Sequence, residues 1–395
     1  MAHGQSHAEG LWALIMASRI GAIAGAVAAG VKARGLSRSV EVFDRARWSR
    51  DEASSWQRRI PRLFGCNFAP STAGNQLEVW QAETFDPVTI DRELGWAATL
   101  LGMNSIRLYL HDLAWQVDPT GFLQRLDEVL GIAASHGISV MPVLFDGIWD
   151  PEPRPGLQRS PRPGIHNSTW VQSPGAAVLS DRSRWAGLGD YVAAVMGRFG
   201  TDDRVVVWDL FNEPDSFNPA YAHRDAAHKR RLTAELLEQV WDWAVEANPD
   251  QPLTVGVYEQ VQHHPERASR VARIAIERSD VISFHCYQGE AVLHQAIRRL
   301  GRYERPVICT EWLGRPVSPV RLARVFAAEE VGAYAWGLVD GRTQTKFSWT
   351  SWYRRDRATR GWFHELLHPD GTPYDEQEAS VMRGASPRTD LRSPP

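Results

Sequence analysis

Residues 205–215 read VVVWDLFNEPD, and this stretch carries the clearest sign of the fold. Residues 205–211 are mostly β-branched or apolar, which predicts a buried strand. Pro214 follows closely and marks the turn at which the strand ends. Glu213 is therefore expected where a buried strand opens into a loop.

A second glutamate occupies the same kind of position. Residues 306–316 read PVICTEWLGRP, in which an apolar run precedes Glu311 and a turn marked by Gly314 and Pro316 follows it. An isolated Asn-Glu-Pro tripeptide is a weak signal. Two strand-end glutamates form a strong one, because catalytic groups of a (β/α)8 barrel collect at the carboxyl ends of its strands.

Strand-like runs alternate with amphipathic helical stretches along most of the chain. This alternation predicts parallel βαβ units, and eight such units close into a barrel. The predicted fold class is therefore α/β, a (β/α)8 TIM barrel with long loops on its catalytic face. The strands are expected at residues 63–68, 105–110, 139–145, 205–211, 253–258, 281–287, 307–311 and 333–339, and helices at 89–101, 120–136, 182–199, 225–247 and 266–278.

The expected barrel spans residues 61–385. Residues 1–60 form an N-terminal extension with a lead-in helix near 50–59, and residues 386–395 are expected to be a disordered tail. Residues 11–30 are apolar, but Arg19 interrupts them and no Lys or Arg precedes them, so the pattern fits neither a signal peptide nor a membrane span well. A small-residue helix and an extension without structural role both stay open.

Composition describes an ordinary globular protein, with 43% hydrophobic residues and a net charge of −3. The sequence contains no run of Lys and Arg long enough to indicate a nucleic-acid partner. Cys66, Cys286 and Cys309 fall in predicted strands and are expected to be buried free thiols. Three cysteines make no disulfide framework, which favours a cytoplasmic location over secretion.

Two long loops are expected on the same face as the glutamates, at residues 69–86 and 146–180. Loops of this length are functional or disordered. Trp149, His166, Asn167 and Trp170 interrupt the second loop and favour an ordered wall around a pocket. A closed pocket favours exo action or short oligosaccharides.

Two carboxylates at a barrel mouth can divide the work of glycoside hydrolysis, since one donates a proton and the other attacks the sugar carbon. Asn212, beside Glu213, is placed to hydrogen-bond a sugar hydroxyl. Arg107 is expected to supply positive charge to Glu311, or else to form a structural ion pair with Asp209.

Further strand-end residues are candidates for the same site, each with a structural alternative. Tyr287 is a donor to Glu311, and His285 belongs to the site or satisfies a backbone carbonyl. Trp336 is either the floor on which a sugar stacks or a plug of the core. His111 and Asp146 are candidates for binding substrate hydroxyls.

The segments WDLFNEP, FHCY, CTEW and AWG together resemble clan A glycoside hydrolases, the retaining (β/α)8 enzymes that include cellulase family five. The resemblance covers roughly residues 61–380. It implies that Glu213 is the acid/base and Glu311 the nucleophile, and that Asn212 contacts the 2-hydroxyl. It further implies that Arg107 and Tyr287 orient Glu311, and that Trp336 stacks on the sugar.

Two other stretches are similar to bacterial proteins labelled cellulase-like or xylanase-like: GCNFAPSTAGNQLEVWQAETFD from Gly65 and WFHELLHPDGTPYDEQE from Trp362. Many members of the wider family carry a His at the end of strand three, where this chain reads LFDGIWD with Asp146. Because of this departure, the sequence does not identify the sugar on which the protein acts.

The expected function is a retaining glycoside hydrolase that acts on β-linked oligosaccharides or short glycosides without cofactor or metal. A transglycosylase with the same two glutamates and a non-catalytic carbohydrate-binding barrel are the alternatives. A metal-dependent barrel hydrolase is disfavoured because the sequence has no H-x-H or H-E-x-x-H motif. The oligomeric state stays open.

Overall fold

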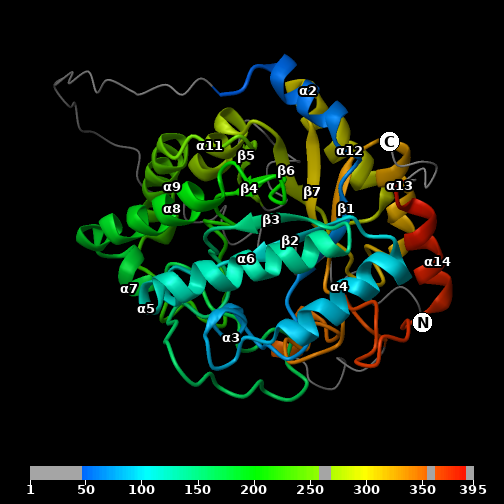
Figure 1. Cartoon of the computed structure of the whole chain (residues 1–395), viewed down its shortest axis with the longest axis horizontal. Coiled ribbons are helices and arrows are strands. Elements are labelled where there is room, and N and C mark those ends of the chain that lie inside the picture. The colour runs from blue at the N-terminus through cyan, green and yellow to red at the C-terminus, as the bar shows by residue number, and fades with distance from the viewer. Residues whose placement is uncertain (1–46, 258–267, 354–360, 388–395) are drawn as a thin grey trace, which may run out of the picture. The chain divides into compact units, whose positions relative to one another are not determined.

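Eight parallel strands form one sheet, in the order β5-β4-β3-β2-β1-β8-β7-β6 (Figure 1). This computed structural model describes residues 47–257, 268–353 and 361–387, all within the unit Asp44–Pro395. The expectations for residues 11–30 and 388–395, and for most of 1–60, lie outside the described residues. The strands are β1 (Phe64–Phe68), β2 (Ser105–Tyr109), β3 (Ser139–Val143), β4 (Trp208–Asp209), β5 (Leu253–Thr254), β6 (Ile282–His285), β7 (Val307–Trp312) and β8 (Gly332–Trp336).

The sheet closes into a barrel between its outer strands, β5 and β6. The backbone N–H of Asp280 donates to Leu253 O at 2.9 Å, and that of His285 donates to Val257 O at 3.1 Å. The predicted (β/α)8 barrel is confirmed, with every predicted strand present. The regular pairing of β4 and β5 is shorter than predicted, because neighbouring residues make only single hydrogen bonds such as Glu213 N to Gly256 O.

Helices surround the strands, as Figure 1 shows. Five of the larger ones match predicted helices, and α2 (Arg50–Arg59) is the expected lead-in helix. The remaining helices were not named in the prediction, and most of them are too short for a helical period to show in the sequence. The matching helices are α4 (Pro87–Leu101), α6 (Pro119–Ser135), α8 (Trp185–Phe199), α9 (Lys229–Glu246) and α11 (Arg270–Arg278); the others include α3 (Gln76–Trp80), α5 (Asp112–Val117), α7 (Ala176–Leu179), α12 (Glu290–Leu300), α13 (Ala323–Ala328) and α14 (Glu376–Ala385).

Local sequence sets the ends of these helices. Asp86 accepts a hydrogen bond from Thr89 N at the start of α4, and Pro87 supplies the fixed φ of its first turn. Gly102 ends α4 at φ 69°, a left-handed conformation that favours glycine. The same Asp-Pro start recurs at α6, with Asp118 as the cap.

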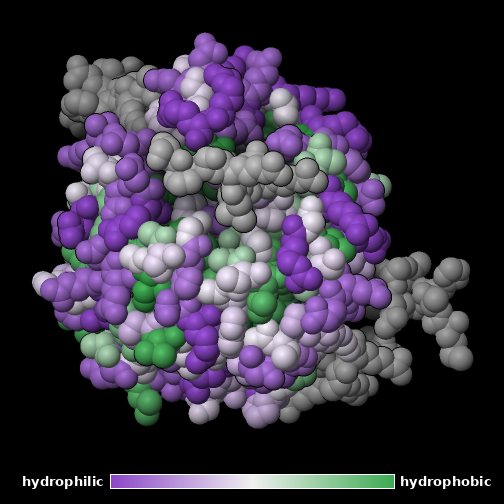
Figure 2. All heavy atoms as spheres, turned by 45° about the vertical axis from the view of Figure 1, so that its right-hand side comes forward, coloured by the Kyte–Doolittle hydropathy of each residue, from purple (hydrophilic) through white to green (hydrophobic). Residues whose placement is uncertain are grey.

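The two ends of the barrel differ in character. At the amino-terminal end, Trp56 of α2 packs with Leu63, Val281 and Tyr334 in an apolar cluster. Lead-in helix α2 therefore contributes to the packing at this end, while the polar residues collect at the other. Figure 2 shows one face of the molecule, where hydrophilic residues predominate and hydrophobic ones form small groups.

Cys66, Cys286 and Cys309 are buried and free of disulfides, as predicted. Among the described residues, no helix combines the length and apolar character needed to span a bilayer.

Candidate active site

Glu213 lies just beyond β4, in a backbone conformation that few residues adopt. Its φ is 40°, in the left-handed region, which costs free energy and is typical of functional sites. A hydrogen bond of 2.8 Å from its N–H to Gly256 O holds it there. Gly147 passes so close that a Cβ there would lie 2.4 Å from Glu213 O. Neighbouring backbone therefore fixes this position.

Glu311 lies in β7, where the strand is irregular. Between Cys309 and Trp312, β7 has one residue more than the paired stretch of β8. A second register shift accompanies the pairing of His285 with Glu311 on the β6 side. A bulge of this kind redirects a side chain and is common beside active sites. It places Glu311 opposite Glu213 at the barrel mouth.

The two carboxylates are close to each other. An oxygen of Glu213, a ring nitrogen of His285 and an oxygen of Glu311 all lie within 4.8 Å of one another. The expected separation of about 5–5.5 Å is consistent with this contact, whereas a gap of about 8 Å is not. Among the described residues, this is the one trio of His and carboxylate groups close enough to hold a metal ion.

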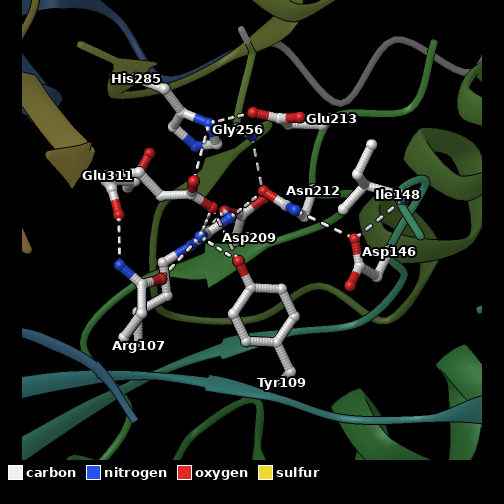
Figure 3. Close-up of polar contacts among 12 residues, drawn as sticks. Arg107, Tyr109, Asp146, Ile148, Asp209, Asn212, Glu213, Gly256, His285 and Glu311 are labelled. Atoms are coloured by element: carbon white, nitrogen blue, oxygen red, sulfur yellow. Dashed lines mark hydrogen bonds and ion pairs between the residues drawn. The ribbon is translucent and has the colours of Figure 1, made fainter. Parts of the chain in front are cut away.

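Glu311 receives hydrogen bonds from three side chains. Arg107 Nη1 donates to Oε1 at 3.0 Å, Tyr109 OH donates to the same oxygen at 2.9 Å, and Tyr287 OH donates to Oε2 at 2.9 Å. The cationic guanidinium of Arg107 and two hydroxyl groups thus converge on this one buried carboxyl group. The expected contacts of Arg107 and Tyr287 with Glu311 are present in the structure. Figure 3 shows Arg107, Tyr109 and Glu311 among the polar contacts of this site.

Glu213 has the opposite environment. Burial raises its pKa to about 7, although Ser216 and Arg107 act against the shift. Its Oε2 accepts from Ser216 Oγ at 2.7 Å, and its Oε1 lies 2.8 Å from His285 Nδ1. Burial also lowers the pKa of His285 to about 4, so this ring is neutral near pH 7. Glu213 thus retains its proton at a pH where most carboxyl groups have lost theirs.

Arg107 connects Glu311 to the barrel wall. Its Nε and Nη2 donate to Asp209 Oδ2 at 3.0 and 2.8 Å. Its remaining donors reach Asn67 Oδ1 at 2.8 Å and Asn212 Oδ1 at 2.7 Å. The structural ion pair with Asp209 and the contact with Glu311, considered as alternatives from sequence, exist together.

Asn212 is oriented by two residues at once. Its Oδ1 accepts from Arg107 and its Nδ2 donates to Asp146 Oδ1 at 3.0 Å. Since an amide carries two N–H donors, one remains for a ligand. Asp146 is 1% exposed and also accepts from Trp170 Nε1 and Gln76 Nε2, so its carboxylate faces protein donors. The structure places Asp146 behind Asn212.

His111 lies apart from this network. It is the N-cap of α5, and its Nδ1 accepts from Leu113 N at 3.1 Å. Its other close contact is with Asp112, at 3.3 Å. Among the described residues, no contact joins His111 to either glutamate.

Trp336 ends β8 and is 8% exposed. It packs edge-on against Tyr109 and Trp170, with ring centroids 5.8 and 6.1 Å apart. Trp170 and the fully buried Asn167 belong to the loop of residues 146–180, whose expected order is observed. Aromatic side chains therefore surround one side of the site.

Two site residues were missed in the sequence. Tyr109 lies two residues after Arg107, and side chains at that spacing in a strand point to the same face. Gly256 interrupts an apolar run, which is typical of a close backbone approach. A Cβ at Gly256 would lie 2.9 Å from Arg107 Nη2 and 3.1 Å from His285 Nε2.

No protein-family model matches the chain, and no curated protein matches it by sequence. Solved structures do match. GH5_18 from Streptomyces cattleya, in complex with GlcNAc, has a TM-score of 0.56 at 15% identity, over 85% of this chain and 82% of that one. The exo-beta-1,4-mannosidase of Opitutaceae bacterium strain TAV5 has a TM-score of 0.55 at 18% identity, over 82% of this chain and 59% of that one.

A glycoside hydrolase family 5 mannosidase from Rhizomucor miehei matches with a TM-score of 0.52 at 12% identity, over 82% of this chain and 93% of that one. At these identities the similarity is one of fold. It agrees with the (β/α)8 barrel expected from the sequence resemblance.

Proposed function

We propose that the protein is a retaining glycoside hydrolase that cleaves β-linked oligosaccharides or short glycosides by double displacement. The observation that carries this proposal is the pairing of two buried carboxyl groups within 4.8 Å in opposite environments. Retaining enzymes place their two carboxyl groups about 5–5.5 Å apart, whereas inverting enzymes leave about 6.5–9.5 Å for a water molecule.

In the first step, Glu311 attacks the anomeric carbon and the bond to the leaving oxygen breaks. Glu213 donates its proton to that oxygen, which leaves as an alcohol. Arg107, Tyr109 and Tyr287 hold the attacking carboxylate in its orientation. The product of this step is a glycosyl ester of Glu311.

In the second step, Glu213, now a carboxylate, takes a proton from water, and the oxygen of that water attacks the anomeric carbon. The ester bond breaks and Glu311 is released as a carboxylate. His285, neutral near pH 7, contacts Glu213 at 2.8 Å and fixes it for both proton transfers. The free N–H of Asn212 is placed to hold the 2-hydroxyl, and Trp336 to support the sugar ring.

A β-mannoside is the first substrate to test. Among the structures with this fold, one is named an exo-beta-1,4-mannosidase, and a second was solved with Manb1-4GlcNAc. The ordered loop of residues 146–180 supports short substrates.

A panel of 4-nitrophenyl glycosides, furanosides included, tests the activity. On the best substrate, Glu311→Ala should abolish turnover, since no glycosyl ester can form. Glu213→Ala should retain the first step with a good leaving group, because general acid help of roughly 10²–10⁴-fold matters least there. Added azide should then accelerate release of the sugar, since an anion needs no general base.

If Glu213→Ala lost as much activity on substrates with good leaving groups as on substrates with poor ones, these roles would be refuted. Activity that EDTA removes and a divalent metal restores would instead indicate that Glu213, His285 and Glu311 act as metal ligands. Product analysis separates hydrolysis from transfer to a sugar acceptor.

A further inference from the structure

A small cavity lies next to the proposed catalytic centre. The residues that line it include the aromatic Tyr109, Trp170 and Trp336 and the polar Asn167, Thr345 and Glu365. Its free space is about 20 Å³, which exceeds the roughly 10–15 Å³ that one water molecule requires. The cavity therefore has room for one group of the size of a hydroxyl.

Two side chains present unsatisfied polar atoms in this region. Asn167 is 0% exposed, and both its Oδ1 and its Nδ2 are without a hydrogen-bond partner among the described residues. Glu365 is 1% exposed, and its Oε2 is likewise without a partner. A buried polar atom without a partner costs about 1–3 kcal/mol, so such atoms indicate a site that another molecule completes.

Glu365 is held firmly in its orientation. Its Oε1 accepts a hydrogen bond from Thr345 Oγ1. The next two residues donate backbone hydrogen bonds to Leu338 O, at 3.0 and 2.8 Å. At Gly337, whose φ is 83°, a Cβ would lie 2.5 Å from Glu365 Oε2. Glycine at this position leaves space for the free carboxyl oxygen beside the cavity.

Asn167 is held in a similar way. Its φ of 49° is in the left-handed region, which asparagine tolerates better than most residues. Its backbone N–H donates to Thr343 O at 2.8 Å. The amide therefore occupies a fixed place in the cavity wall without a side-chain partner.

Tyr109 and Trp336 connect the cavity to the proposed reaction centre. Tyr109 lines the cavity and donates to Glu311 at 2.9 Å. Trp336 lines it from the end of β8, opposite Asn67 of β1 in the sheet register. A sugar attached to Glu311 and supported by Trp336 would therefore bring a ring substituent to the cavity.

We propose that Asn167 and Glu365 form a subsite that binds one hydroxyl group of the sugar ring supported by Trp336, and thereby determine which sugars the protein accepts. A hydroxyl both donates and accepts a hydrogen bond. It can pair with the free oxygen of the Glu365 carboxyl group and with the Asn167 amide, which offers both a donor and an acceptor. This inference rests on the proposed glycosidase function.

Sugars that lack one hydroxyl test the subsite. The 4-nitrophenyl glycoside that the protein hydrolyses fastest is compared with its monodeoxy derivatives, each lacking a different ring hydroxyl. In the wild type, one derivative should lose kcat/KM by roughly tenfold to a hundredfold, the size of one buried hydrogen bond. In Glu365→Gln and Asn167→Asp, the penalty for that derivative should shrink to less than about threefold.

Matched controls separate this effect from general damage. Glu93→Gln removes another buried carboxyl group, which is hydrogen-bonded to Ser71 instead of lining the cavity. Asn248→Asp makes the same change at an exposed residue with φ 47°. Both controls should keep the wild-type pattern. An unchanged penalty in the two cavity variants would overturn the subsite and leave the cavity as a water site, while the proposed activity would stand.

If the wild type hydrolyses no glycoside, the proposed function fails. The subsite is then tested by the binding of free sugars. Calorimetric titration with d-mannose, d-glucose, d-galactose and GlcNAc then compares the wild type with Asn167→Asp. Binding that weakens at least tenfold in the variant supports the subsite. Absence of binding to the wild type, or equal binding to both proteins, overturns it.

Discussion

Glu213 and Glu311 are the same residue type with different surroundings. Glu213 is buried with a neutral His285 and the hydroxyl of Ser216 beside it. Glu311 receives the positive charge of Arg107 and two tyrosine hydroxyls. Pairs of titratable groups whose environments differ in this way are typical of acid and base roles.

Activity should fall on the alkaline side of about pH 7. Burial raises the pKa of Glu213 to about 7, and the proposed general acid works only while protonated. The pH dependence of kcat/KM on an unactivated substrate should therefore show an alkaline limb near pH 7. In Glu213→Gln, the residual activity should lack this limb. A limb that persists unchanged in the variant would assign the titration to another group.

Removal of one donor to Glu311, the proposed nucleophile, should lower activity without unfolding the protein. Tyr109→Phe removes the 2.9 Å hydrogen bond to Glu311, and a bond to a charged group is worth about 1.5–3 kcal/mol. We expect kcat/KM to fall roughly tenfold to a hundredfold. Steady-state kinetics measures the loss.

Tyr334→Phe is the matched control, since its hydroxyl pairs with Ser105 inside the barrel at 2.8 Å. That variant should change stability more than kinetics. Comparable kinetic losses in both variants would show that Tyr109 acts through packing alone.

Some residues of the candidate site could be identified from the sequence, and the partners of others could not. Glu213 and Glu311 lie at the ends of predicted strands and Arg107 lies within one, so chemistry and position together pointed to them. Asp146 also ends a strand, but its orientation toward Asn212 depends on Trp170 and Gln76, which lie far from it in the chain. Side-chain partners of this kind are set by tertiary packing, which strand periodicity does not encode.

At the scale of elements, long periodic segments were predicted best. Helices α4 and α6 lie within two residues of their predicted bounds, because Asp-Pro starts and apolar periodicity both mark them. The predicted loop of residues 69–86 contains α3, whose five residues are all buried. A single helical turn that is buried on all sides has no amphipathic pattern to detect.

The observed contacts of His111 are those of a helix cap, so its effect should be on α5 as an element. His111→Ala should lower the free energy of unfolding by roughly 1–2 kcal/mol through the lost cap of α5, and with it the melting temperature. His111→Asn, which can also cap, should recover part of the loss. Thermal unfolding and kinetics on the same preparations check this expectation. A large fall in kcat/KM at unchanged stability would contradict this and indicate that His111 binds substrate.

At the scale of the whole molecule, eight strand signals were enough to predict a closed barrel. The closure between β5 and β6 was not visible in the sequence, because it depends on individual hydrogen bonds such as His285 N to Val257 O. Parallel strands and alternating helices leave few other architectures for a chain of this length.

Buried carboxyl groups should make the protein less stable as the pH rises. Burial raises the pKa of Glu365 to about 8 and that of Asp146 to about 7. In the unfolded chain these groups titrate near pH 4, so the folded state binds more protons between about pH 4 and 8. Their contribution is complete below about pH 4 and is lost as the pH rises through the folded pKa.

The expected change is on the order of a few kcal/mol for each group. Melting temperatures from pH 5 to 9 should therefore decline, and Glu365→Gln, which cannot ionise, should decline less. An identical slope in the wild type and the variant would show that Glu365 does not titrate in this range.

The stereochemistry of hydrolysis distinguishes the proposed double displacement from a single displacement by water. Glu213 and Glu311 present oxygens within 4.8 Å of each other, a separation shorter than the roughly 6.5–9.5 Å of inverting enzymes. Proton NMR of the hydrolysis of a β-glycoside, recorded before mutarotation, identifies the first sugar released. Double displacement through Glu311 should release the β-anomer first, because the anomeric carbon is inverted twice. The α-anomer as the first product would contradict it.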